Sequence, residues 1–125
     1  MTPPRIVLVD DHALFRAGVR AELEGRVEVV AEAGTVEEGV AAIVEHEPDV
    51  VLLDPPRAGA GPAVSRLLAG TGARAVVYVA CDPAALARDV AAFAEGGYRL
   101  AAVRGLDAFP MTAHVECVAL LVPAS

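Results

Sequence analysis

The sequence predicts an α/β domain built as a three-layer sandwich, with a mostly parallel six-stranded sheet between helices. Short runs of β-branched and apolar residues recur along the chain, as buried strands require. Apolar stripes at helical spacing lie between these runs, and capping residues or glycines mark their ends. The chain has 125 residues, of which 55% are hydrophobic. Residues 1–125 are therefore expected to form one domain.

The pattern places six strands, at residues 5–9, 27–31, 50–53, 75–80, 98–104 and 115–122. Phe15, Val19 and Leu23 form one helical stripe, and a capping box at Thr35 and Glu38 begins a second helix. Helices should also begin at residues 62 and 83, where proline fits the first turn. Roughly ten irregular residues join the last two strands, and a parallel crossover needs more. We therefore expect the sixth strand to run antiparallel.

Composition and charge exclude several classes of function. All ten basic residues are arginine, so chemistry that needs a lysine is excluded. Residues 1–54 carry 12 acids and 4 arginines, and the whole chain has a net charge of −7. This charge disfavours nucleic-acid binding by the chain on its own. No apolar run approaches the roughly 20 residues of a membrane span, so no membrane partner is expected. Two cysteines are too few for a disulfide framework, which favours a cytoplasmic location.

Carboxylates follow two of the predicted strands. Asp10 and Asp11 end the first strand, and Asp54 ends the third. Ligands of open α/β sheets bind at the carboxyl ends of the strands, where these three side chains should meet. Carboxylate oxygens are the ligands that Mg²⁺ prefers, so the pattern predicts a magnesium site. The alternative is that Asp11 only caps a helix and that Asp54 is only a turn residue.

The strings VLVDDHALFRAGVRAELEG (7–25) and PDVVLLD (48–54) resemble the first half of a bacterial response-regulator receiver domain, over roughly residues 4–54. The resemblance implies that Asp10, Asp11 and Asp54 bind Mg²⁺ and that Asp54 accepts a phosphoryl group. Two features depart from that family. Strand four ends in Ala80 and Cys81 rather than Ser or Thr, and Arg104 stands near the position of the family's lysine.

A second set of candidate residues lies in the other half of the chain. Cys81 follows the fourth strand directly before a helix, and the positive end of a helix favours the thiolate form. A small buried cysteine without function is the common alternative. Glu116 lies in the apolar run of the sixth strand, where a glutamate is either on an exposed face or functional.

The strings LDPPRAGAG (53–61), VVYVACDPAALARDV (76–90), GYRL (97–100) and DAFPMTAHVECVALL (107–121) resemble RNA (uracil-5-)-methyltransferases, over roughly residues 49–125. The resemblance implies that Cys81 attacks C6 of uracil, that Glu116 removes the C5 proton, and that Arg57 lies with Asp54 in the pocket wall. Such enzymes need a glycine-rich turn after strand one, and no glycine precedes Gly18 here. S-adenosylmethionine is therefore not an expected cofactor.

Together these observations predict a chimera with a receiver-like half (1–54) and a methyltransferase-like half (55–125). The two resemblances imply a flavodoxin-like and Rossmann-like hybrid with strand order 2-1-3-4-6-5. The expected function is a hybrid domain without evolved catalytic turnover that retains at most divalent-metal binding. One alternative is a receiver-like phosphoacceptor at Asp54, and another is a remnant of an S-adenosylmethionine-dependent RNA uracil-5 methyltransferase. A homodimer, formed through an exposed sheet edge or apolar patch, stays open.

Overall fold

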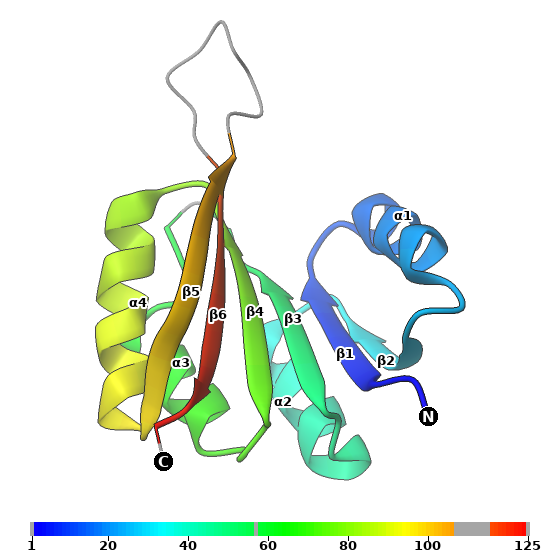
Figure 1. Ribbon diagram of the computed structural model, residues 1–125, viewed down its shortest axis with the longest axis horizontal. Helices are drawn as coiled ribbons and strands as arrows, with labels where there is room; N and C mark the ends of the chain where they lie inside the picture. The colour runs from blue at the N-terminus through cyan, green and yellow to red at the C-terminus, as the bar shows by residue number, and fades with distance from the viewer. Residues whose placement is uncertain (1, 57, 107–115, 125) are drawn as a thin grey trace, which may run out of the picture.

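A computed structural model of the chain describes residues 2–56, 58–106 and 116–124. Its centre is a six-stranded sheet in the order β2-β1-β3-β4-β6-β5 (Figure 1). The strands are β1 (Arg5–Asp10), β2 (Glu28–Ala33), β3 (Val50–Asp54), β4 (Ala75–Ala80), β5 (Tyr98–Leu106) and β6 (Glu116–Pro123). The first four strands pair in parallel, and β6 is antiparallel to both β4 and β5. The predicted strand order and the direction of the sixth strand are confirmed.

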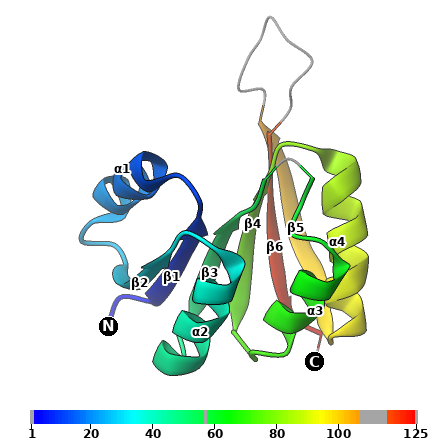
Figure 2. The ribbon, with the colours of Figure 1, turned by 180° about the vertical axis from the view of Figure 1, so that it is seen from behind.

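The four helices are α1 (Ala13–Leu23), α2 (Val36–His46), α3 (Pro62–Ala69) and α4 (Pro83–Glu95). Figures 1 and 2 show α2, α3 and α4 together on one face of the sheet and α1 on the other side, near β1. The side chain of Thr35 accepts a hydrogen bond from the amide of Glu38, as the capping box predicts. None of the helices in the described residues has the length and hydropathy that a membrane crossing requires.

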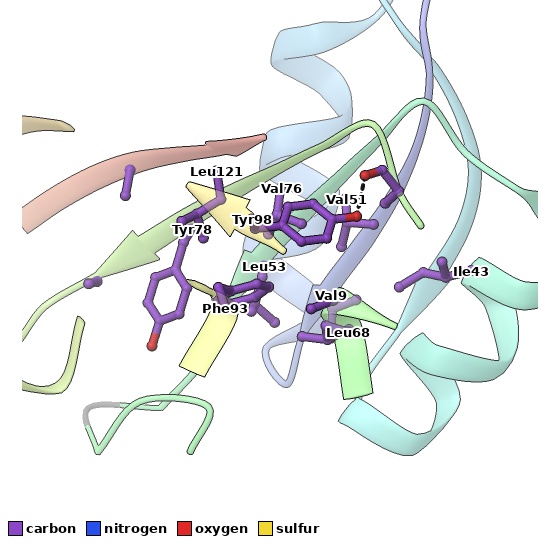
Figure 3. Close-up of a cluster of buried hydrophobic side chains, with 14 of the residues drawn as sticks. Val9, Ile43, Val51, Leu53, Leu68, Val76, Tyr78, Phe93, Tyr98 and Leu121 are labelled. Atoms are coloured by element: carbon purple, nitrogen blue, oxygen red, sulfur yellow. Dashed lines mark hydrogen bonds between the residues drawn. The ribbon is translucent and has the colours of Figure 1, made fainter. Parts of the chain in front are cut away.

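The face under α2, α3 and α4 holds the hydrophobic core (Figure 3). Alternate residues of the central strands point into it, which is the period-two pattern of a half-covered sheet. The rings of Phe93 and Tyr98 meet edge to face with their centroids 6.0 Å apart. Burial raises the pKa of the Tyr98 hydroxyl, which donates a hydrogen bond to the carbonyl of Ala73. This core fixes α4 and β5 relative to the strands that carry the site.

The opposite face, called here the open face, is only partly covered by the described residues. It presents the alternate side chains of β3, β4 and β6, and Figure 1 looks onto it. A groove of about 1070 Å³ lies on this face next to α1, and Ile6, Leu14, Leu52 and Val77 are part of its apolar lining. The groove also reaches Asp54, so it opens onto the carboxyl ends of the strands.

Candidate active site

Two aspartates lie side by side at the carboxyl ends of β1 and β3. Asp10 and Asp54 are register partners in the parallel pair, so both side chains project from the same face of the sheet. Asp10 is only 6% exposed, and its Oδ1 accepts a hydrogen bond from the amide of His12 at 2.9 Å. Its buried Oδ2 has no hydrogen-bond partner among the described residues. Such an atom needs a proton, a donor or a cation.

The carboxyl group of Asp54 shows the consequence of this crowding. Burial, and then the negative charge of Asp10, raise the pKa of Asp54 to about 7. The charges of Glu116 and Asp11 act in the same direction. A proton or a positively charged ligand at this point relieves the repulsion, so the site favours cations over anions.

Cys81 and Glu116 come together because β6 runs antiparallel to β4. The register pairs Val76 with Leu121 and Ala80 with Cys117, and its continuation by one residue places Cys81 opposite Glu116. Directly opposite residues on one face have Cβ atoms about 4.5–5.5 Å apart. Glu116 alternates with the buried Cys117, so it projects from the open face. The register thus brings the end of β4, which Cys81 follows directly, beside the start of β6 at Glu116, and the charge of Glu116 reaches Asp54.

Cys81 lies directly before the first turn of α4. Cys81 is a free, half-buried cysteine, and Asp82 caps α4 by accepting a hydrogen bond from the amide of Ala84 at 3.0 Å. The positive end of the helix dipole therefore lies beside Cys81. Helix N-termini stabilise thiolates, which are the nucleophilic form of cysteine.

A cavity of about 210 Å³ lies at the ends of β1 and β3, beside the turn that begins α2. Its lining combines carboxylates, a glycine turn and prolines: Val9, Asp10, Asp11, Gly34, Thr35, Val36, Leu53, Asp54, Pro55 and Pro56. The guanidinium of Arg16 donates a hydrogen bond to the backbone oxygen of Asp10, which holds the turn after β1 in place. This cavity is a candidate for a small-molecule ligand at the carboxyl edge of the sheet.

The remaining predicted site residues lie further out. Arg104 is an exposed residue of β5 and pairs in register with Val118, on the same face as Glu116. Arg57 lies outside the described residues.

Among the described residues, the side chains that could share a metal are Asp10, Asp11 and the exposed His12, rather than the predicted group with Asp54. The helix cap is His12, so the alternative that Asp11 caps α1 is wrong.

The sequence analysis missed Asp89, whose carboxylate is fully buried in α4. It accepts hydrogen bonds from the Tyr78 hydroxyl and from the amides of Ala60 and Gly61. A signal was present, because Asp89 falls three residues after Leu86 on the apolar stripe of its helix. A charged residue on a buried stripe indicates a specific set of partners.

Comparison with known proteins places the chain among RNA methyltransferases. A family model described as tRNA (Uracil-5-)-methyltransferase matches residues 38–123. An uncharacterized RNA methyltransferase of Streptomyces coelicolor is 50% identical over 117 residues, which cover 89% of this chain and 26% of the relative. The chain thus spans about a quarter of the length of that relative.

Two solved structures are similar to the chain. The tRNA (uracil-54, C5)-methyltransferase of Pyrococcus abyssi, in complex with S-adenosyl-L-homocysteine, has a TM-score of 0.67 and 27% identity, with 98% of this chain and 34% of that chain covered. The signal receiver domain of NarL from Mycobacterium tuberculosis has a TM-score of 0.57 and 34% identity, with 78% of this chain and 80% of that chain covered. The methyltransferase therefore matches more of this chain, and with the higher TM-score.

The predicted chimera with a receiver-like half is wrong. The methyltransferase model begins at residue 38, inside the half assigned to a receiver, and the Streptomyces relative aligns over 89% of the chain. The assignment to response regulators, the phosphoacceptor role of Asp54 and the hybrid without catalytic turnover are overturned with it. The confusion has a physical source, because the string DVVLLD at residues 49–54 suits a buried parallel strand in either family.

A family model covers more than half of the chain, and a relative of 50% identity aligns over 89% of it. The chain belongs to the tRNA (uracil-5-)-methyltransferase family.

Proposed function

We propose that this chain carries the catalytic groups of an enzyme that methylates C5 of uridine in RNA, with Cys81 as nucleophile and Glu116 as base. The observation that supports the proposal most strongly is the antiparallel register of β4 and β6, whose last pair is Ala80 and Cys117, the residues next to Cys81 and Glu116. The groove on the open face reaches the same end of the sheet and offers a path for a base.

The proposed chemistry needs a nucleophile and a base on one side of the uracil ring. The thiolate of Cys81 adds to C6, which breaks the C5–C6 π bond and makes C5 nucleophilic. After C5 has gained a methyl group, the carboxylate of Glu116 takes the C5 proton. The electron pair of the C5–H bond then restores the double bond, and the Cys81 thiolate leaves C6. The thiolate is regenerated, and the proton rests on Glu116.

The carboxylates that line the cavity support S-adenosylmethionine as the methyl donor, in contrast to the expectation from the missing glycine-rich turn. The cofactor carries a sulfonium and an ammonium group against a single carboxylate, so it is a net cation. The buried, unpartnered Oδ2 of Asp10 and the raised pKa of Asp54 both fit a positive ligand. When bound, the cofactor supplies the methyl group. Asp10, Asp54 and the Gly34–Val36 turn would hold it.

Magnesium binding was predicted from the three carboxylates and was also implied by the receiver resemblance, and the methyltransferase proposal does not require it. RNA is the expected macromolecular partner, in contrast to the expectation from net charge. The single domain and the homodimer remain predictions.

Methyl transfer from labelled S-adenosylmethionine to RNA tests the proposal. RNA should be incubated with the chain, digested to nucleosides and assayed for labelled 5-methyluridine. We expect the label with wild-type protein and only background with Cys81→Ala. Cys117→Ala is a matched control, because that cysteine projects into the core and should not be needed. Equal background from wild type and Cys81→Ala would contradict the proposal.

A further inference from the structure

Asp89 is a buried carboxylate that no step of the proposed reaction uses. Its Oδ2 lies 2.8 Å from the amide nitrogen of Ala60, and its Oδ1 lies 3.2 Å from that of Gly61. The Tyr78 hydroxyl donates to the same Oδ2, and the Arg88 Nε lies 3.4 Å from Oδ1. The hydrogen bond and burial raise the pKa of Tyr78, so the hydroxyl keeps its proton and remains a donor. A carboxylate with 0% exposure persists only with such a full set of partners.

The backbone that Asp89 holds is the segment of residues 58–61, called here the glycine turn. The amide of Gly59 donates to the carbonyl of Pro56 at 2.8 Å, and Gly59 has a φ of 85°. A Cβ at Gly59 would lie 2.6 Å from the Asp89 Oδ2. The glycine turn therefore lies directly on the carboxylate, at a position where only glycine fits.

The glycine turn follows the residues that form one wall of the proposed cofactor cavity. Pro55 and Pro56 line that cavity together with Asp54. Asp89 belongs to α4, whose first turn lies beside Cys81. Its hydrogen bonds thus attach the end of the cavity wall to the helix that also fixes the nucleophile.

We propose that Asp89 is a positioning residue of the methyltransferase site, whose carboxylate fastens the glycine turn to α4 and so holds Pro55 and Pro56 as the wall of the cofactor cavity. This inference rests on the proposed function. Asp89 and its partner Tyr78 are buried on the core side, so they act through the backbone and do not touch substrate. The expected consequence of their loss is weaker cofactor binding with an intact nucleophile.

Calorimetric titration with S-adenosylhomocysteine tests this role in the full chain. We expect Asp89→Asn to raise the Kd about tenfold or more, because two backbone donors lose a charged acceptor. Tyr78→Phe should raise it by a smaller factor. Glu95→Gln is the matched control on the same helix, since Glu95 is exposed and pairs only with Arg66 among the described residues. Its Kd should equal that of wild type.

Two further readouts separate positioning from a loss of stability. In methyl transfer, Asp89→Asn should raise the KM for the cofactor and leave kcat at saturating cofactor within about twofold, whereas partial unfolding would lower kcat alone. Gly59→Ala leaves the carboxylate in place but must displace the glycine turn, so it should raise KM in the same way. If Asp89→Asn does not fold, Gly59→Ala tests whether the position of the glycine turn sets the KM for the cofactor.

The failure of this inference can be distinguished from the failure of the proposed function. Wild-type Kd and KM in folded Asp89→Asn or Gly59→Ala protein would overturn the positioning role alone. Wild-type protein that neither binds S-adenosylhomocysteine nor methylates RNA would overturn both. In Asp89→Asn, NMR amide resonances of Ala60 and Gly61 that differ from wild type, together with a raised KM for the cofactor, would support the positioning role of Asp89.

Discussion

Cys81 and Glu116 act at different steps of the proposed reaction, so their replacements should leave different products. Glu116→Gln removes the proton acceptor, and the bond between Cys81 and C6 breaks only when the C5 proton leaves. We expect this variant to accumulate a covalent protein–RNA complex in the presence of S-adenosylmethionine, visible on a denaturing gel. The double variant with Cys81→Ala should form none. Turnover of Glu116→Gln at the wild-type rate would assign the base to another residue.

Asp54 predicts a pH dependence of stability that follows from its crowded position. Its pKa rises from 3.8 in the unfolded chain to about 7 in the folded one, so between these values the folded state binds more protons. The contribution of Asp54 is therefore most favourable below about pH 4 and is lost as the pH rises through 7. Urea midpoints at pH 5 and pH 8 should differ less for Asp54→Asn than for wild type. If the midpoints at pH 5 and pH 8 differ as much in Asp54→Asn as in wild type, Asp54 does not cause the pH dependence of stability.

At the scale of elements, two helical glycines should respond in opposite ways to the same substitution. A Cβ at Gly39 in α2 would lie 2.8 Å from a methyl group of Val9, whereas one at Gly18 in α1 meets nothing within 4 Å. Gly39→Ala should destabilise the fold by about 1–3 kcal/mol through overpacking. Gly18→Ala should stabilise it by about 0.5–1 kcal/mol. Chemical denaturation gives the free energy of unfolding of both variants. Equal changes in that free energy would contradict the close packing of α2 on β1.

The strands and the direction of the last one could be predicted from burial and connection length, whereas the strand order came from the two family resemblances. Val50–Leu53 and Ala75–Ala80 are continuous apolar runs that only a buried sheet accommodates, and the short connection before β6 fixed its direction. The position of Cys81 opposite Glu116 could not be read from spacing, because it depends on the insertion of β6 beside β4. The resemblance supplied that insertion. The partners of Asp89 were out of reach, because they come from three separate segments.

Motifs in the sequence indicated the right family for residues 55–125 and a wrong one for residues 1–54. Short strings at the ends of parallel strands are set by shared physical demands, such as burial of the strand and carboxylates at its end. They discriminate poorly between families that share this architecture. Alignment along 89% of the chain uses far more positions, and it overturned the chimera.

The proposed site lies on the open face of the sheet, and the groove beside α1 lies on the same face. Asp54 and Glu116 belong to that side, while α2, α3 and α4 cover the other (Figures 1 and 2). We propose that the nucleophile and the base act on this face, next to a cofactor cavity at the carboxyl ends of β1 and β3 beside the start of α2.

The most direct test is the mass of the chain after reaction with RNA that contains 5-fluorouridine, in the presence of S-adenosylmethionine. Fluorine at C5 cannot leave as a proton does, so the step assigned to Glu116 is blocked and the protein stays bonded to C6. The account predicts a stable adduct whose RNA maps to the peptide that contains Cys81, with none for Cys81→Ala. An adduct at Cys117, or unmodified wild-type protein, would contradict it.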